Sequence, residues 1–208
     1  FPPRFAPILQ EMEPLAALFR EAGHRLFLVG GSVRDLFLGD TDAGTDLSLI
    51  DFDATTTATP DQIKKIVQPV ADALWTQGER FGTIGLKIGE RTYEITTHRA
   101  EAYSPDSRKP EVQFATDIET DLSRRDFTIN AMALELTTDT PELVDPFGGL
   151  ADLMARVLRT PLSAEESFSD DPLRMLRAAR FISQLEVAPD PSITAAVTAM
   201  ADRLTIVS

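Results

Sequence analysis

The feature that most constrains the fold of this chain is an apolar run that ends in a pair of glycines. Residues Leu26 to Val29 predict a buried strand, which leads into Gly30 and Gly31 and then into Ser32, a residue type that often caps helices. The first backbone N–H groups of a helix that begins there point toward whatever occupies the glycine turn. The sequence therefore predicts a strand, a turn and a helix that together suit the oxygens of a triphosphate.

Two aspartates follow further along the chain, where Asp51 and Asp53 flank Phe52. On a strand, both carboxylates project from one face and Phe52 projects from the other. Neighbouring carboxylates supply the oxygen ligands that Mg²⁺ prefers, and a pair of such ions is a common device for transferring a nucleotidyl group. We therefore expect a Mg²⁺-dependent nucleotide site.

The composition bounds the possible partners. The chain has 208 residues, of which 43% are hydrophobic, and a formal net charge of −13. This acidic total argues against nonspecific nucleic-acid binding by the chain as a whole, because the phosphate backbone attracts clustered Lys and Arg. A local basic face stays open, because the second half of the chain contains Arg124, Arg125, Arg156, Arg159, Arg174, Arg177 and Arg180.

Two absences narrow the setting further. No stretch approaches the roughly 20 apolar residues of a membrane span, and the first residues lack the basic and apolar regions of a signal peptide. The chain has no cysteine, which excludes thiolate metal sites and agrees with a reducing cytoplasm. We expect a cytoplasmic protein without a membrane partner, whose metal is held by oxygen ligands.

The hydrophobic pattern predicts an α+β fold, in which a mixed sheet with flanking helices is followed by a helical segment. The predicted strands are 26–29, 46–56, 74–75, 82–88, 92–98 and 132–136. The predicted helices are 7–22, 32–38, 60–73, 117–131, 149–155, 163–168, 170–185 and 190–204. The change of pattern predicts a head domain of residues 1–148 and a neck domain of residues 149–208, and the polar loop 100–111 is a candidate lid.

Seven segments, taken in order, resemble the bacterial tRNA nucleotidyltransferase and poly(A) polymerase family, the class II branch of the polymerase-β-like nucleotidyltransferases. They are LVGGSVRD (28–35), DFDATT (51–56), RFGTIGLKIG (80–89), YEITTHR (93–99), DLSRRDFTINAMA (121–133), VDPFGGLADL (144–153) and ESFSDDPLRMLRAARF (166–181). The resemblance is nearest to actinobacterial members. It implies a nucleotidyltransferase head and an all-α neck, as the first part of a longer protein whose helices continue into body and tail domains.

The resemblance implies that a first group of residues handles metal and phosphate. The catalytic carboxylates would be Asp51 and Asp53, which hold the metal ions, with Glu94 as a third carboxylate nearby. The residues that would contact the triphosphate are Gly30, Gly31, Ser32 and Arg34.

A second group would recognise the rest of the nucleotide. The residues for ribose and phosphates would be Arg124, Arg125 and Asp126, in a turn that Asn130 fixes. Asp171 and Arg174 are three residues apart, so on a helix both side chains share one face. A carboxylate acceptor beside a guanidinium donor can match the Watson–Crick edge of cytosine or adenine.

Some residues in the same segments are interpreted as structural. Arg177 and Arg180 lie on the same predicted helix as the base-recognition arginine and are left outside the site. Phe181 is assigned to the packed side of that helix, and Phe81 to the packing of the sheet. His98 is expected to hydrogen-bond locally rather than to bind metal.

The position of the metal ligands is open between two pairs. Within loop 40–50, Asp46 and Ser48 form a competing match, in which a serine replaces the second carboxylate and one metal ligand is missing. We favour Asp51 and Asp53, because the residues after them continue the family pattern without a gap. On this interpretation residues 40–50 are an insertion.

A member of this family would transfer CMP and AMP from CTP and ATP to the 3′ end of tRNA, as CCA addition or repair. The reaction would follow a two-metal mechanism and release pyrophosphate, without a nucleic-acid template. Two alternatives stay open: a poly(A) polymerase that acts on RNA 3′ ends, and a catalytically weak module that binds nucleotide or RNA. The sequence does not indicate an oligomeric state.

Overall fold

The computed structural model describes residues 1–39, 51–100, 102–103, 110–111 and 113–206. The alternative metal pair, Asp46 and Ser48, lies outside the described residues, as does most of the predicted lid. No helix in the described part of the chain is long and apolar enough to cross a membrane.

A seven-stranded mixed sheet forms the centre of the head, in the order β3-β4-β5-β2-β1-β8-β9. Its strands are β1 (Leu26–Val29), β2 (Phe52–Thr56), β3 (Ala73–Trp75), β4 (Thr83–Ile88), β5 (Arg91–Thr97), β8 (Ala133–Glu135) and β9 (Glu142–Val144). Only the β2–β5 pair within this sheet is parallel. The predicted mixed sheet with flanking helices is therefore confirmed, although β9 had no counterpart in the predicted strands.

One side of this sheet, named the closed face here, is covered by helices. Leu28, Ala54, Ile95 and Ile84 stand opposite one another on four neighbouring strands and are all buried. They share one hydrophobic core with residues of α1 (Phe5–Glu21) and α4 (Pro60–Val67). Burial on this side explains why apolar residues alternate along β4 and β5. The helix α4 begins with a capping box at Thr59 and ends six residues before the predicted end at 73.

The opposite side of the sheet is named the open face here, and it carries Val29, Asp53, Glu94, Gly85 and Trp75. The helix α5 (Ile118–Ser123) covers only its β1 end, by packing apolar side chains against β1 and β8. The polar residues of β2 and β5 on this face are thus left beside a cleft rather than beneath a helix.

The prediction of a helix over 117–131 is wrong for the second half of that range. After α5 the chain is extended at Phe127, and it then forms a single 3-10 turn, η3 (Thr128–Asn130). The Phe127 N–H donates to the Asp126 carboxylate at 2.7 Å, and the Thr128 N–H donates to the carbonyl of Arg159 at 2.8 Å. These two bonds take the place of helical backbone bonds, because the Asp126 side chain and the distant Arg159 carbonyl accept from the N–H groups.

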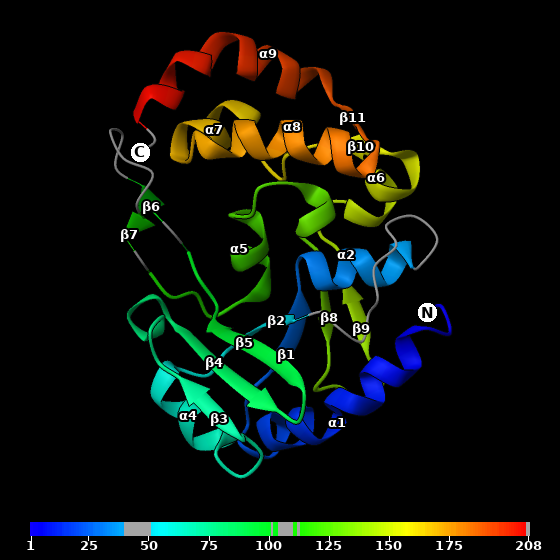
Figure 1. Cartoon of the computed structure of the whole chain (residues 1–208), viewed down its shortest axis with the longest axis vertical. Helices are drawn as coiled ribbons and strands as arrows, with labels where there is room; N and C mark the ends of the chain where they lie inside the picture. The colour runs from blue at the N-terminus through cyan, green and yellow to red at the C-terminus, as the bar shows by residue number, and fades with distance from the viewer. Residues whose placement is uncertain (40–50, 101, 104–109, 112, 207–208) are drawn as a thin grey trace.

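Residues beyond 148 are mainly helical and stack at one end of the molecule, with the sheet at the other end (Figure 1). The elements are α6 (Gly149–Ala155), α7 (Ala164–Asp170), α8 (Leu173–Leu185), α9 (Pro191–Met200) and η4 (Ala201–Ile206), with β10 (Val157–Leu158) and β11 (Ala188–Pro189) as a small parallel pair. Phe168 and Phe181 belong to the same core as Leu28 of the sheet. The domain boundary at 148/149 stays a prediction, because the core crosses it.

Candidate functional site

The glycine turn after β1 brings backbone close to an arginine. Gly30 has φ +70°, a conformation that L side chains rarely adopt. A Cβ atom placed on Gly30 would stand 3.4 Å from Nη1 of Arg125, so the guanidinium lies in contact with the turn. The helix α2 (Gly31–Leu38) begins at once, and the Val33 and Arg34 N–H groups donate to the Gly30 carbonyl. The turn thus presents a helix start and a cation together.

The carboxylates gather on the open face next to this turn. Asp53 on β2 stands directly opposite Glu94 on β5, so the two side chains leave the sheet on the same side. Asp51 precedes β2, and all three residues are exposed. The Asp53 N–H donates to the Ser32 hydroxyl at 3.4 Å, which links the strand to the glycine turn.

Asp53 has the clearest electrostatic strain in this group. Burial against the surrounding protein, the negative charge of Glu94 and that of Asp51 raise the pKa of Asp53 to about 6, against an opposing effect of Arg125. The side chain is nevertheless accessible to solvent on its cleft side. Mutual repulsion of this kind is relieved when a cation binds between the carboxylates.

The donor set fits a cation that is shared with a bound phosphate. In the described residues, no group of three or more His, Asp or Glu side chains has the arrangement of a complete metal site. Mg²⁺ is usually held by one or two carboxylates together with water and substrate phosphate oxygens, so a partial protein site suits it. The candidate ligands are Asp51, Asp53 and Glu94.

A cleft of about 500 Å³ lies between the open face and α8. It collects ten of the thirteen predicted site residues, namely Gly30, Gly31, Arg34, Asp53, Arg124, Arg125, Asp126, Asn130, Asp171 and Arg174. The other three are not part of its lining: Ser32 is buried behind the turn, and Asp51 and Glu94 lie beside Asp53 on the sheet. The structure thus brings these residues together, and their individual roles stay predictions.

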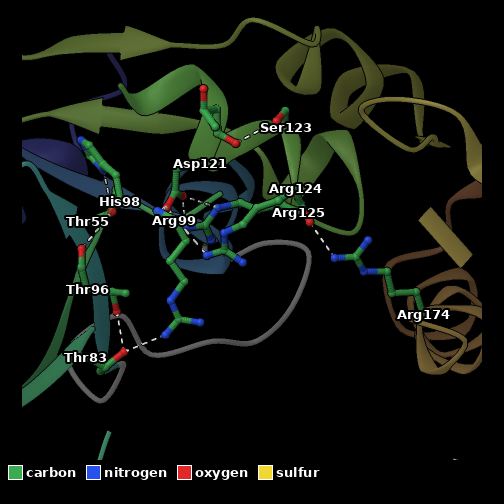
Figure 2. A network of polar contacts seen from close by, with 11 residues as sticks. Thr55, Thr83, Thr96, His98, Arg99, Asp121, Ser123, Arg124, Arg125 and Arg174 are labelled. Carbon is green, nitrogen blue, oxygen red and sulfur yellow. Dashed lines mark hydrogen bonds and ion pairs between the residues drawn. The ribbon is translucent and has the colours of Figure 1, made fainter. Parts of the chain in front are cut away.

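A buried carboxylate fixes the arginines of the cleft, as Figure 2 shows. Asp121 on α5 is 0% exposed and accepts from Arg125 Nη2 at 2.8 Å and from the Arg99 backbone N–H at 2.8 Å. Burial alone would raise the pKa of Asp121, but the charges of Arg125 and Arg124 and the bond from Arg99 hold it below its usual value. Asp121 begins the DLSRRD segment, but nothing local in the sequence marks it as the residue that fixes the arginines.

A second chain of contacts joins the phosphate turn to the helices. Arg34 donates to the Asn130 side-chain oxygen at 2.5 Å, and the Asn130 amide donates to the Asp126 carboxylate at 3.1 Å. The other oxygen of that carboxylate is 2.6 Å from Nη2 of Arg177 on α8. Arg34 and Arg177 both lie against the ring of Phe181. Two cationic groups are thereby held on one side of the cleft.

A family model for the poly A polymerase head domain matches residues 26–159, which is more than half of the chain. The chain belongs to this family. A CCA-adding enzyme from Bacillus subtilis (strain 168) is 41% identical to it over 185 residues, which cover 88% of this chain and 43% of that protein. The predicted family is therefore confirmed.

Solved structures give the same result. The crystal structure of Bacillus stearothermophilus CCA-adding enzyme in complex with CTP matches with a TM-score of 0.79 at 31% identity, and covers 100% of this chain and 46% of that one. A Thermotoga maritima CCA-adding enzyme complexed with tRNA matches with a TM-score of 0.73 at 28% identity, covering 97% and 43%. This chain of the poly A polymerase head family thus spans less than half the length of these relatives. The nearer resemblance to actinobacterial members stays a prediction.

The match to the poly A polymerase head domain ends at residue 159. The wall of the cleft that contains Asp171, Arg174 and α8 residues therefore lies beyond the matched segment. Asp171 and Arg174 do not share a helix face as predicted. Asp171 lies before α8 in extended conformation, and its carboxylate accepts from the Leu173 N–H at 3.1 Å. Pro172, between them, separates α7 from α8.

Arg174 is buried, and its guanidinium crosses from α8 to the head (Figure 2). Its Nη1 donates to the Ser167 hydroxyl at 3.0 Å, and its Nη2 donates to the carbonyl of Arg124 at 2.6 Å. The bond to Ser167 holds the guanidinium against α7, and the bond to the Arg124 carbonyl links it to the arginine segment of the head. Whether either residue of the Asp171 and Arg174 pair reads a base stays a prediction.

Four cleft residues beyond the head domain were interpreted as structural or not mentioned: Arg177, Arg180, Phe181 and Gln184. They follow one another at intervals of three, one and three residues along α8, which turns them toward one side of the helix. That spacing is visible in the sequence, but it does not distinguish a cleft-facing side of the helix from a solvent-facing one. Phe181 also belongs to the core as expected, while Phe81 is 38% exposed rather than buried. Phe181 therefore both packs in the core and lines the cleft.

His98 behaves as a local hydrogen-bonding residue. Its Nδ1 lies 2.8 Å from the Thr55 hydroxyl, on the open face behind the arginine network (Figure 2). Burial lowers the pKa of His98, so the ring is neutral near pH 7. A neutral ring bonded to a threonine supports the β2–β5 pair.

Proposed function

We propose that this chain is the nucleotide-binding and catalytic part of a tRNA nucleotidyltransferase, which transfers CMP and AMP from CTP and ATP to the 3′ end of tRNA. One observation carries the proposal: Asp53 of the open face, with Glu94 directly opposite it on the sheet, meets the arginines of two walls in a single cleft. The relatives named CCA-adding enzymes support it, one in complex with CTP and another with tRNA.

The charges divide the reaction between the two sides of the cleft. Arg34 and Arg125, beside the glycine turn, would bind the β- and γ-phosphates and stabilise the leaving pyrophosphate. The 3′-hydroxyl oxygen of the RNA forms a bond to the α-phosphorus while the bond from that phosphorus to the β-phosphate bridge breaks. The hydroxyl proton passes to solvent, so the chain needs no histidine near the reacting atoms.

Asp51 and Asp53, with Glu94 beside them, would hold divalent cations such as Mg²⁺, which supply charge neutralisation and a more acidic hydroxyl. The carboxylates themselves fix where the α-phosphate must lie, because they stand at the sheet end of the cleft. The raised pKa of Asp53, about 6, is the cost of keeping them close.

Base selection belongs to the far wall of the cleft. The carboxylate of Asp171 would accept from an exocyclic amino group, which both cytosine and adenine carry. Arg174, on the same wall, would donate to a ring nitrogen or carbonyl of the base. This arrangement needs no template strand, and we assign it to a cytoplasmic enzyme of tRNA processing.

A poly(A) polymerase is the second candidate, because the matching family is described by that activity. The cleft residues are the same for both, so the products separate them. A third outcome is a module that binds nucleotide or RNA but hardly turns it over.

The test incubates the chain with Mg²⁺, labelled CTP or ATP, and tRNA that lacks its 3′ CCA. We expect incorporation of C and then A, and its loss in the double variant Asp51→Ala, Asp53→Ala. The matched control is Asp46→Ala, which should incorporate normally. A ladder of many A residues would favour the polymerase, and nucleotide binding without any incorporation would leave the binding module.

A further inference from the structure

The open face continues past the carboxylates to the edge of the sheet. Asp53 stands opposite Glu94, Glu94 opposite Gly85, and Gly85 opposite Trp75 on the edge strand β3. Residues paired in this way project from the same side of a sheet. One straight row therefore joins the candidate metal site to Trp75, across three strand spacings of about 4.8 Å each.

Trp75 packs over Gly85 on this row. A Cβ atom placed on Gly85 would stand 3.2 Å from Cε3 and 3.4 Å from Cβ of Trp75, so a side chain there would press against the indole. Trp75 is 38% exposed. An indole that packs over bare backbone and remains partly exposed can serve as a stacking platform for a nucleobase.

Cationic groups border the same row. Lys87 on β4 stands two residues from Gly85 and opposite Ala73, so it projects from the open face. On the other side, Arg99 Nη2 donates to the Thr83 hydroxyl at 3.1 Å, and this hydroxyl lies 2.8 Å from that of Thr96 (Figure 2). Positive charge on both sides of an aromatic platform suits a phosphate backbone and its bases.

We propose that the open face between Asp53 and Trp75 is the track of the RNA strand whose 3′ end reacts, with a base of that strand stacked on Trp75. This inference rests on the proposed function and adds the location and the recognition of the second substrate. A simpler role, in which Trp75 only covers the backbone of Gly85, predicts an effect on stability and none on RNA binding.

The chain carries a built-in probe, because Trp75 is its single tryptophan. Tryptophan emission is recorded while a short single-stranded RNA with a tRNA acceptor 3′ sequence lacking CCA is added, without nucleotide. We expect saturable quenching that weakens with salt, because stacking and phosphate contacts act together. Binding of a labelled RNA without any change in this emission would overturn the proposal.

Steady-state kinetics provide the second arm. Loss of a stacked base costs a factor of roughly 5 to 100 in affinity. The variant Trp75→Ala should raise KM for tRNA by that factor while KM for CTP stays unchanged, and Trp75→Phe should restore most of the difference. Thermal unfolding of each variant checks that the fold is intact.

The chain offers a matched control on the same strand. Leu74 is also 38% exposed and lies on the opposite, closed side, beside α4. The variant Leu74→Ala should leave KM for tRNA unchanged. If Trp75→Ala and Leu74→Ala have the same KM for tRNA as the parent, the track is elsewhere and the proposal fails.

The outcomes separate this inference from the proposed function. Incorporation with normal KM in Trp75→Ala overturns the track and leaves the enzyme. Quenching by RNA in a protein that never incorporates nucleotide supports the track and overturns the enzyme. A change of sedimentation coefficient in RNA-free Trp75→Ala would assign this face to contacts between copies of the chain and would also overturn the track.

Discussion

At the scale of single residues, the carboxylate of Asp53 is exposed to the cleft and lies near the like charges of Glu94 and Asp51. Its pKa of about 6 lies above the 3.8 of an ordinary aspartate, so the folded state holds this proton more tightly than the unfolded state. The associated stability is complete below about pH 4 and is lost as pH rises through 6. At pH 7.5 the ionised group opposes folding, which is the expected state of a site built for a cation.

The variant Asp53→Asn should therefore unfold at a higher temperature than the parent at pH 7.5, by roughly 2–4 °C for each kcal/mol of repulsion removed. At pH 4 the difference should nearly vanish. Mg²⁺ together with CTP should raise the unfolding temperature of the parent at pH 7.5 by more than it raises that of the variant. Calorimetry at both pH values measures this, and a variant that is less stable at pH 7.5 would refute it.

Asp121 is the opposite case, a buried carboxylate whose pKa is held low by two arginines. It contributes stability above pH 3.8, and this contribution is lost as pH falls through its lower folded pKa. Asp121→Asn should cost about 3–5 kcal/mol in urea unfolding at pH 7, because Arg125 loses its partner in a buried setting. The control is Asp117→Asn at the exposed N-cap of α5, which should cost well under about 1 kcal/mol, because Asn caps a helix about as well as Asp. Equal costs would contradict the account.

At the scale of elements, the contact between α6 and η3 positions the arginine segment. A Cβ on Gly149 would lie 2.1 Å from the carbonyl oxygen of Thr128, whereas one on Gly148 would meet nothing within 4 Å. Gly149→Ala should therefore cost about 3 kcal/mol or more, since backbone must move. Gly148→Ala should cost about 1–2 kcal/mol through its φ of +74° alone. Urea unfolding that ranks the two in reverse would contradict this packing.

Elements with local signals could be predicted from the sequence, and elements decided at a distance could not. The four buried residues of β1 and the alternation of β5 are visible within a few residues. The end of α5 depends on the bond from Thr128 to Arg159, which no local pattern displays. β9 is short and consists of Glu142 to Val144, so its place is set by pairing with β8.

At the scale of the molecule, the cleft joins segments that are far apart in sequence. The glycine turn, the carboxylates and the arginine segment could be predicted because each carries its own residue pattern. Arg177 and Gln184 could not be assigned in this way, since helix-surface residues become cleft residues only when α8 packs against the head. The prediction that Asp171 lies on one helix with Arg174 was wrong, because the chain breaks at Pro172 between α7 and α8.

The variant Arg177→Ala tests whether this arginine serves packing, ligand binding or both. It is 45% exposed, but its partner Asp126 is only 4% exposed, so Arg177→Ala leaves a buried carboxylate oxygen unpaired and should cost about 1–3 kcal/mol of stability. It should weaken CTP binding by roughly 10- to 100-fold, if the cation contacts the triphosphate. Arg159 is 46% exposed and pairs with Asp152 and Asp190 outside the cleft, so Arg159→Ala is the matched control and should bind CTP normally. Calorimetric titration distinguishes the two, and equal CTP affinities would remove Arg177 from the site.

The central claim is that one metal-bound nucleoside triphosphate unites the acidic and basic sides of the cleft. The most direct measurement is Mn²⁺ binding by electron paramagnetic resonance, with and without CTP. We predict tight binding only when CTP is present, a loss of at least about tenfold in Asp53→Asn, and normal binding in Asp46→Asn. Normal Mn²⁺ binding in Asp53→Asn, with its loss in Asp46→Asn, would contradict the claim.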